Sequence, residues 1–469
     1  MLGACVVAAA GLGAGYFAMA TWGDRRPPAW EARLNDSPSS TSPRASGLAV
    51  FSWVLYDFAN SAFPTLVLTF IFSTYFVTTV ATDAALPGDT IWQLVIAVSG
   101  ITVALVSPPL GAVADRGGFK REFLIGASMI CIIATALLWF VGPGDIWLGI
   151  VLFLLANTAF ETGLVFYNAF LPDLNRPEQM GQISGYGYAL GYVGGLTALA
   201  VGLVAFVMPD ALLGLEQETA VRATNLLVAG WFLLFALPQF LFVREFRTEA
   251  PADVPIGTLV RSSFGQLAKT YREVLEYPQV FRFLLARLLY NDGLATIFAF
   301  GGIYATLVFG FEAQELLYFG IALNVSAGVG SFAMGFLDDA IGGKRTVIIS
   351  IIGLLLATIG TIVAWDKTSF FVSALFLGIF VGPNQSASRS FMGRIVPASK
   401  ENEFFGFFAF SGKATSFIGP LVLAFMTWLT GDQRWGVAGI AVLLLAGLGV
   451  LMLVDEDAGI AQAREASEG

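Results

Sequence analysis

Long apolar stretches alternate with short polar connections along most of the chain. Twelve of them are long enough to cross about 30 Å of hydrocarbon at about 1.5 Å of helix per residue. Their expected bounds are 48–80, 91–113, 122–142, 146–171, 181–208, 222–243, 280–309, 314–337, 345–365, 369–392, 402–430 and 435–454. Inside a bilayer the backbone satisfies its hydrogen bonds only in helices or closed barrels. The pattern therefore predicts an all-α integral membrane protein with twelve transmembrane helices.

The longest polar connection divides these segments into six plus six. The expected organisation is an N-terminal extension and linker at 1–46, an N-terminal six-helix bundle at 47–243, a central cytoplasmic loop at 244–279, a C-terminal six-helix bundle at 280–454, and an acidic, solvated cytoplasmic tail at 455–469. Residues 2–21 of the extension are apolar and almost long enough to span a membrane. They are either an extra N-terminal helix or an addition that does not belong to the native protein.

A polar turn occurs twice, the second copy 224 positions after the first, each time between two apolar segments. In both copies an Asp comes four residues after a Gly, and a Gly-Gly pair and two basic residues follow. The residues concerned are Gly111, Asp115, Arg116, Lys120 and Arg121 in the first copy, and Gly335, Asp339, Lys344 and Arg345 in the second. A duplicated turn between membrane-length segments predicts two pseudo-symmetric halves, an architecture typical of transporters.

The repeated turn has a mechanical interpretation and a topological one. Its glycines permit close approach of neighbouring helices, and its aspartates could accept hydrogen bonds from the N-terminus of a neighbouring helix. We therefore expect the residues of both copies to form a cytoplasmic gate. The alternative is that the basic residues only fix the orientation of the loops.

Basic residues predict the orientation of the whole chain. With residues 23–47 in the cytoplasm, nineteen Lys and Arg lie on that side and three, Arg222, Lys367 and Arg434, on the other. This asymmetry predicts a multi-pass protein of the cell (inner) membrane, with both ends of the twelve-helix core in the cytoplasm.

Composition supports a membrane protein and narrows its partners. Apolar residues make up 56% of the chain, charged residues only 13%, and the mean hydropathy is +0.75; soluble domains carry about 25% charged residues. The chain has no His and two Cys in apolar stretches, which predicts no metal site and no disulfide framework. A net charge of −9 argues against nucleic acid as a partner.

Charged side chains inside the membrane segments are the candidate chemistry, because each is costly there. Asp57, Glu161, Asp292 and Lys413 are expected at a similar depth, roughly 13–18 Å from the cytoplasmic ends, around a water-accessible cavity. The carboxylates could carry a proton or bind a substrate ammonium; the alternative is a structural salt bridge, such as Glu161 with Lys413. The candidate site comprises Tyr56, Asp57, Asn60, Glu161, Asn168, Tyr290, Asp292, Arg389 and Lys413.

Several sequence blocks resemble a known family. The repeated turns resemble the cytoplasmic signature of the major facilitator superfamily. The blocks at 53–63, 160–173, 388–390 and 403–413 resemble its vacuole-effluxer-like branch, which includes the fungal autophagy-related vacuolar amino-acid exporter and bacterial relatives. The resemblance covers about residues 48–454 and implies twelve helices in two six-helix bundles. It also implies a role in the site for Tyr56, Asp57, Asn60, Glu161, Asn168, Arg389 and Lys413.

The leading hypothesis is a secondary active transporter that moves an amino acid or a similar small polar solute outward by alternating access, with proton coupling. One alternative is an exporter of amphipathic drugs, given the abundant Phe residues in the membrane segments. A non-transporting receptor or scaffold is the other, although a scaffold has no need of buried charge. We expect no enzyme activity and no cofactor. The expected partners are the lipid bilayer, a small-molecule substrate and a proton, and the expected state is a monomer.

Overall fold

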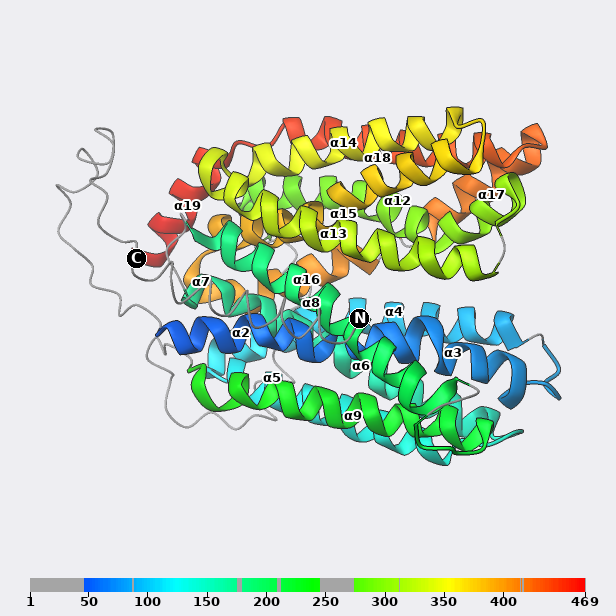
Figure 1. Ribbon diagram of the computed structural model, residues 1–469. Helices are drawn as coiled ribbons and strands as arrows, with labels where there is room; N and C mark the ends of the chain where they lie inside the picture. The colour runs from blue at the N-terminus through cyan, green and yellow to red at the C-terminus, as the bar shows by residue number, and fades with distance from the viewer. Residues whose placement is uncertain are drawn as a thin grey trace. The chain divides into compact units, whose positions relative to one another are not determined.

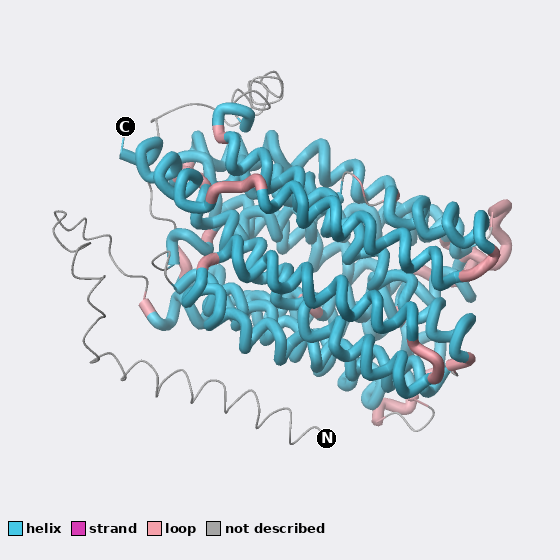
Figure 2. The backbone as a smooth tube through the Cα atoms, turned by 90° about the horizontal axis from the view of Figure 1, so that it is seen from above, coloured by secondary structure: helices cyan, strands magenta, loops and turns pink. Residues whose placement is uncertain are grey.

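The computed structural model describes residues 46–86, 88–174, 179–208, 212–244, 274–311, 313–413, 415 and 417–468. Within these ranges the chain forms helices joined by short loops, and no strand occurs (Figure 2). Ten of the helices are long and apolar enough to cross a membrane, and an eleventh span appears when two arms that meet at a bend of 42° are taken together. The predicted N-terminal extension, apart from residue 46, and most of the predicted central loop lie outside the described residues.

The N-bundle, as we call the first group of helices, runs from residue 47 to residue 242. Its helices are α2 (Gly47–Asn60), α3 (Phe72–Tyr75), α4 (Gly88–Gly117), α5 (Lys120–Leu137), α6 (Ile146–Ala169), α7 (Leu171–Leu174), α8 (Met180–Gly202) and α9 (Gln217–Phe242). The π-helical turns Phe63–Phe70 and Phe76–Val80 continue from α2, so that Gly47–Val80 is one candidate span. A third π-helical turn, Leu203–Val207, extends α8.

The C-bundle, the second group, runs from residue 278 to residue 452. Its helices are α12 (Pro278–Phe309), α13 (Ala313–Ile341), α14 (Gly343–Val363), α15 (Lys367–Ile395), α16 (Glu401–Lys413), α17 (Ile418–Thr430) and α18 (Gln433–Met452). The prediction of one helix over 402–430 is wrong, because α16 ends and α17 begins inside that range. Pro420 lies in the first turn of α17, where a missing N–H group is tolerated.

Both copies of the repeated turn have a glycine with positive φ at the equivalent position. Gly118 has a φ of 63° and Gly342 a φ of 95°. These left-handed values are readily adopted only by glycine, so the Gly-Gly pair lets α4 turn into α5 and α13 turn into α14 within a few residues. The repeat seen in the sequence is therefore a repeat in structure.

The two bundles meet mainly along two helix pairs, with further contacts of α15 on α8 and of α16 on α6. α8 packs along α13, and α4 packs along α16. Figure 1 shows the bundles converging at the end that carries α7 and α19 and diverging toward the end that carries α3 and α17. The first end also carries both repeated turns and is called the basic end below; the opposite one is called the far end.

The acidic tail, expected to be solvated, instead forms a helix that packs on the C-bundle. In α19 (Glu456–Glu468), Oε1 of Glu456 accepts the N–H of Gly343 at 2.9 Å, at the start of α14. Gln462 donates to the carbonyl oxygen of Glu276 at 2.8 Å, and Ala463 is buried. Oε1 can accept this bond whether or not the carboxyl group is protonated, so an acidic residue of the tail helps to anchor it.

The docking of α19 is expected to depend on pH. Burial raises the pKa of Glu456 above its ordinary value, against the opposing effects of Arg394 and of the N–H groups of Lys344 and Gly343. Because the pKa is higher in the docked state, the protonated form of Glu456 stabilises docking. This stabilisation is fully present below the ordinary glutamate pKa, about 4.3, and is lost as the pH rises through the pKa of the docked state. Docking should therefore weaken as pH rises above about 4.3, and Glu456→Gln should remove the dependence. Hydrogen exchange of residues 456–468, corrected for intrinsic rates, measures this docking. Identical pH profiles of exchange in the wild type and in Glu456→Gln would contradict the prediction.

Candidate functional site

A buried ion pair joins the two bundles. Arg389 on α15 is 2% exposed, and its Nη1 lies 3.1 Å from Oδ2 of Asp57 on α2. Asn60 Nδ2 lies 3.5 Å from the other oxygen of Asp57, and Nη1 of Arg389 also donates to Oδ1 of Asn168 at 3.4 Å. The remaining edge of the guanidinium donates to Oγ and the carbonyl oxygen of Ser184 at 2.9 and 2.8 Å. One side chain of the C-bundle thus holds α2, α6 and α8 of the N-bundle.

Aromatic rings enclose this guanidinium. Its Cζ lies 4.4 Å from the ring centroid of Tyr188, 4.7 Å from that of Trp53 and 5.5 Å from that of Tyr167. A cation over an aromatic face is stabilised by about 0.5–2 kcal/mol, with the larger values in desolvated surroundings. At Gly187 a Cβ atom would lie 2.9 Å from Nη2 of Arg389. The absence of a side chain there lets α8 approach the ion pair.

A second buried guanidinium lies within the C-bundle. Arg287 on α12 is 7% exposed, and its Nη1 donates to the carbonyl oxygen of Phe408 at 2.6 Å and to Oγ of Ser411 at 2.9 Å. Its Nε has no hydrogen-bond partner among the described residues. Glu161, half-buried on α6 of the N-bundle, interacts electrostatically with it. Glu161 and Arg287 thus carry opposite charges on opposite bundles.

The other predicted membrane charges are placed differently. Asp292 on α12 is 3% exposed, and its Oδ2 accepts the N–H of Gly419 at 2.8 Å, at the start of α17. Lys413 is the last residue of α16, and its side chain lies outside the described part of the chain. Of the four charges that the sequence places in one layer, three are thus described, and Asp292 binds a helix end rather than another charge.

The two predicted tyrosines point into their own bundles. The hydroxyl of Tyr56 lies 2.8 Å from Oγ of Ser128 on α5, and the hydroxyl of Tyr290 lies 2.8 Å from Oγ of Ser388 on α15. Both tyrosines are 1% exposed. In this conformation they bridge helices of one bundle and do not join the charged residues.

At the basic end, the second repeated turn binds the N-bundle. Asp339 accepts the N–H of Gly181 at 2.8 Å and that of Gln182 at 2.9 Å, at the start of α8. Arg394 on α15 bridges both acids of the turn, with 2.9 Å to Asp339 and 2.6 Å to Asp338. N–H groups and the helix dipole favour an anion at this position. Sequence analysis expected such a bond for Asp339; its gating role stays a prediction.

The first repeated turn binds the C-bundle through a lysine. Nζ of Lys120 lies 2.6 Å from Oε2 of Glu401, the first residue of α16, and 2.9 Å from Oδ2 of Asp173. It also donates to the carbonyl oxygen of Ala169 at 2.9 Å. Lys120 is 4% exposed, so this is a buried charge with three oxygen partners. The side chains of Asp115 and Arg116, two further predicted gating residues of this turn, lie outside the described residues.

The glycines of the repeat lie where the two bundles approach each other closely. At Gly111 a Cβ atom would lie 2.8 Å from Cα of Glu403 on α16. At Gly335 it would lie 3.0 Å from the carbonyl oxygen of Gly181 on α8. Any side chain at either position would push the two bundles apart at the basic end.

The remaining predicted gating residues bind within their own bundle or face outward. Nε of Arg121 donates to the carbonyl oxygen of Phe240 at 3.2 Å, near the end of α9. Nζ of Lys344 donates to the carbonyl oxygen of Met452 at 3.4 Å, at the end of α18. Basic side chains are favourable at helix C-termini. Arg345 is exposed.

The geometry agrees with what comparison with known proteins shows. The model of the vacuole effluxer Atg22-like family matches residues 88–464. The chain belongs to this family. YxiO of Bacillus subtilis strain 168, an uncharacterized MFS-type transporter, is 29% identical over 412 residues, which cover 87% of this chain and 94% of YxiO. Autophagy-related protein 22 of Coccidioides immitis is 22% identical over 433 residues, which cover 76% and 71% of the two chains.

Solved transporter structures share the fold of this Atg22-like chain. The superfamily transporter FucP in the outward conformation has a TM-score of 0.66 at 13% identity, covering 87% of this chain and 98% of FucP. The human organic anion transporter MFSD10 has a TM-score of 0.68 at 14% identity, covering 86% and 99%. The predicted family and fold class are confirmed: this is a multi-pass membrane transporter of the major facilitator superfamily.

The sequence analysis identified most of the buried charged residues but not several of the residues that bind them. Ser184, Asp338 and Glu401 make inter-bundle bonds or support them, yet none was proposed for the site. Arg394 was counted only as a basic residue of the cytoplasmic side. The available signal was the pair of adjacent acids at 338–339, where the first copy of the turn has one. A lone serine in an apolar helix gives no such signal.

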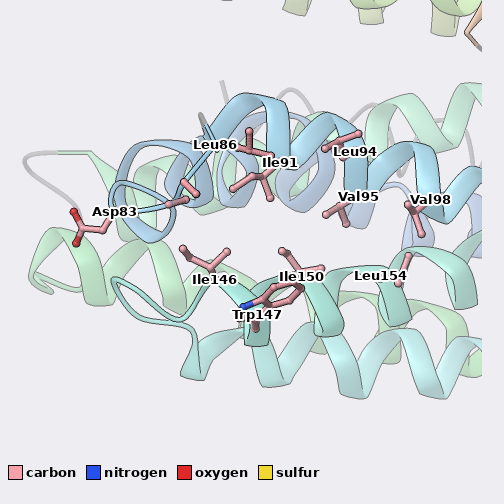
Figure 3. Close-up of a pocket in the computed structure, with 12 residues that line it drawn as sticks. Asp83, Leu86, Ile91, Leu94, Val95, Val98, Ile146, Trp147, Ile150 and Leu154 are labelled. Atoms are coloured by element: carbon pink, nitrogen blue, oxygen red, sulfur yellow. The ribbon is translucent and has the colours of Figure 1, made fainter.

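An apolar groove lies elsewhere in this Atg22-like chain, at the far end of the N-bundle (Figure 3). Ile91, Leu94 and Val98 of α4 line it together with Ile146 and Ile150 of α6, around about 540 Å³. Apart from one aspartate at its edge, the lining is apolar. Because such a lining offers few partners to a polar solute, we do not assign the groove to the transport site.

Proposed function

We propose that this protein exports amino acids, or similar small zwitterions, by alternating access between the N-bundle and the C-bundle. The observation that carries the proposal is the placement of Glu161 and Arg287, opposite charges on opposite bundles. Glu161 lies eight residues from the basic end of α6 and Arg287 nine residues from that of α12. At about 1.5 Å per residue, both are about 12–14 Å deep.

A zwitterion matches the chemistry of these two groups. The planar guanidinium of Arg287, with an Nε that no described residue occupies, suits a carboxylate. The carboxylate of Glu161 suits an ammonium. Because each group belongs to a different bundle, a substrate that binds both favours the conformations in which the bundles are close around it. The family description, vacuole effluxer, supports export.

The proposal extends to orientation and energy source. The asymmetry of basic residues supports a cytoplasmic position for the basic end, and a conformer tied at that end would face outward. The sequence has no phosphate-binding loop, so we assign the energy to a proton gradient. The bacterial relative YxiO supports the cell membrane as the location. We further propose a monomer that works in the lipid bilayer with one solute and a proton and performs no catalytic step.

Ligand-induced stabilisation tests the proposal. Purified protein is heated with each of the twenty L-amino acids. A ligand at 100 times its Kd should stabilise the fold by about 2.7 kcal/mol. Glu161→Gln and Arg287→Gln should each weaken binding at least about tenfold, because a hydrogen bond to a charged group contributes about 1.5–3 kcal/mol. Exchange of the same amino acid in proteoliposomes should fall in parallel.

The matched control is Lys367→Gln. It removes an exposed ion pair with Glu315, 2.7 Å long, at the far end, and exposed pairs contribute about 0–1 kcal/mol. Its response to amino acids should equal that of the wild type. Stabilisation by amphipathic drugs alone would replace the proposal with drug export. No response to amino acids, drugs, sugars or peptides would favour a receptor or scaffold.

A further inference from the structure

One carboxylate of the membrane segments is buried without a counter-ion among the described residues. Asp292 is 3% exposed, near the middle of α12. Its Oδ2 accepts the N–H of Gly419, whereas its Oδ1 has no hydrogen-bond partner among the described residues. Asp57 differs, because its carboxylate is paired with Arg389. Within the described part of the chain, Asp292 thus presents one free oxygen in a buried site.

The helices packed against α12 bring no described cation to this carboxylate. α17 contains no charged residue, and Arg434 of α18 donates to the carbonyl oxygen of Ile362. On α12 itself, Arg282 donates to Gln279 and to the carbonyl oxygen of Leu453, and Arg287 is bound to Phe408 and Ser411. The other charged residues on these helices are Glu315, Asp338 and Asp339 on α13, Lys367, Arg389 and Arg394 on α15, Glu401, Glu403 and Lys413 on α16, and Glu456, Asp457, Arg464, Glu465 and Glu468 on α19. None of those whose side chains are described forms an ion pair with Asp292.

Asp292 is also part of a clamp on a broken helix. Hydrogen bonds tie the end of α16 and the start of α17 to α12, among them one from Nδ2 of Asn291 to the carbonyl oxygen of Gly412 at 3.2 Å. Oγ1 of Thr415 donates to the carbonyl oxygen of Leu288 at 3.1 Å, and the N–H of Gly419 donates to Asp292 at 2.8 Å. Leu288 and Asp292 are about one helical turn apart on α12. The charge on Asp292 therefore acts on one of the hydrogen bonds that join α12 to the start of α17.

We propose that Asp292 is the proton-binding residue of this transporter, with the proton on Oδ1. The inference rests on the proposed function for the use of a proton gradient. Protonation adds one O–H bond at the free oxygen and breaks none, since Oδ2 keeps the N–H of Gly419. A metal cation fits less well, because the start of α17 presents N–H groups and the positive end of a helix dipole.

Proton binding then selects a conformation. An ionised carboxylate is costly to bury without a partner, so the proton favours the conformer that buries Asp292. That conformer is closed at the basic end, where α16 begins with Glu401 and binds Lys120 of the N-bundle. When α17 moves and Asp292 reaches water, the carboxylate ionises and the proton leaves. α16, one helix of 13 residues, links the clamp to this inter-bundle tie.

The test needs no substrate. Thermal unfolding of the purified full-length protein is followed from about pH 5 to about pH 8, for the wild type and Asp292→Asn. Asparagine keeps an oxygen for Gly419 but does not titrate. As pH rises toward the value at which Asp292 ionises, the ratio of folded to unfolded wild type should fall by up to about tenfold per pH unit relative to the variant. Parallel curves for the two proteins would overturn the proposal.

The matched control is Asp432→Asn. Asp432 accepts the N–H of Arg434 at 2.9 Å at the start of α18, but it is exposed. It shares the capping role of Asp292 without the burial, so its variant should keep the pH dependence of the wild type. A control that loses this dependence as Asp292→Asn does would assign the effect to capping and overturn the proposal.

If Asp292→Asn does not fold, an experiment on the wild type alone still tests whether Asp292 binds the proton. Dicyclohexylcarbodiimide modifies protonated carboxyl groups in apolar surroundings, and mass spectrometry finds the modified residue. Asp292 should be labelled at about pH 5 and progressively less toward about pH 8. Labelling of Asp57 or Glu161 without Asp292, or of no residue, would contradict the assignment.

Transport separates this inference from the proposed function. In proteoliposomes supplied with a radiolabelled mixture of L-amino acids, Asp292→Asn should lose accumulation driven by a pH gradient at least about tenfold and keep exchange. Accumulation that depends on a sodium gradient and not on a pH gradient would overturn the proposal that Asp292 binds a proton. If the wild type transports no amino acid but shows the pH-dependent stability, the substrate class is wrong and the proton site stands.

Discussion

Replacing Arg389 by alanine is expected to abolish transport and to lower the free energy of unfolding by about 3–5 kcal/mol. The guanidinium is buried and bonds to Asp57 and Ser184 of the other bundle. Its removal leaves Asp57, whose side chain is only 13% exposed, as an uncompensated carboxylate. The stranded charge destabilises the fold, and the missing tie disrupts the cycle. Thermal unfolding and amino-acid exchange in proteoliposomes measure the two effects.

Arg389→Lys separates charge from shape. A lysine restores a cation beside Asp57, so most of the stability should return. It cannot donate along a planar edge to both oxygens of Ser184 while stacking on Trp53, and exchange should remain at least about tenfold below the wild type. Arg464→Ala, on the exposed face of α19, should change neither quantity. Exchange at the wild-type rate in Arg389→Ala would show that this ion pair has no part in transport.

Gly111→Val is expected to preserve both bundles and to shift the protein away from the conformer closed at the basic end. The new side chain would overlap Asn402 and Glu403 of α16, which belongs to the other bundle. Such overlap is relieved when the bundles separate, so it acts on the conformational equilibrium more than on folding. Overpacking costs about 1–3 kcal/mol, which corresponds to a shift of about fivefold to 150-fold in the ratio of closed to open forms.

Distances between spin labels at positions 244 and 345 measure this shift. Both positions are exposed and lie at the basic end, one in each bundle; Cys5 and Cys131 are replaced by serine beforehand. The distance should lengthen in Gly111→Val. Gly330→Val is the control, because a Cβ atom there would meet Ile379 within the C-bundle. The control should unfold more easily without a change in distance, and the same behaviour in Gly111→Val would contradict the prediction.

Alternating access requires at least three described ties to break. Asp339 must leave the start of α8, Lys120 must leave Glu401 at the start of α16, and Arg389 must leave Asp57. The ties of Asp339 and Lys120 hold equivalent places in the two halves, because each joins a repeated turn of one bundle to the start of a helix in the other bundle. Both are charge-assisted bonds in buried surroundings, so they favour a closed state without locking the basic end permanently.

Part of the candidate site was predictable from residue type and position. Asp57, Arg389 and Asn168 were singled out because polar groups are costly in apolar segments, and the structure brings them together. The same reasoning placed Tyr56 and Tyr290 beside the charges, yet they face their own bundles. Adjacent residues on a helix point in directions about 100° apart, so two residues that are neighbours in sequence need not face the same side of the helix.

The sequence by itself determined the membrane spans, their grouping into two related halves and the repeated turns. These features depend on local hydropathy and on glycine conformations, which are properties of short stretches of chain. Only the tertiary structure decided that Arg389 pairs with Asp57, that α16 and α17 are separate helices, and that α19 docks on the C-bundle. Each of these depends on groups that are far apart in sequence and meet only when helices pack, and hydropathy averaged along one segment contains no information about its neighbours.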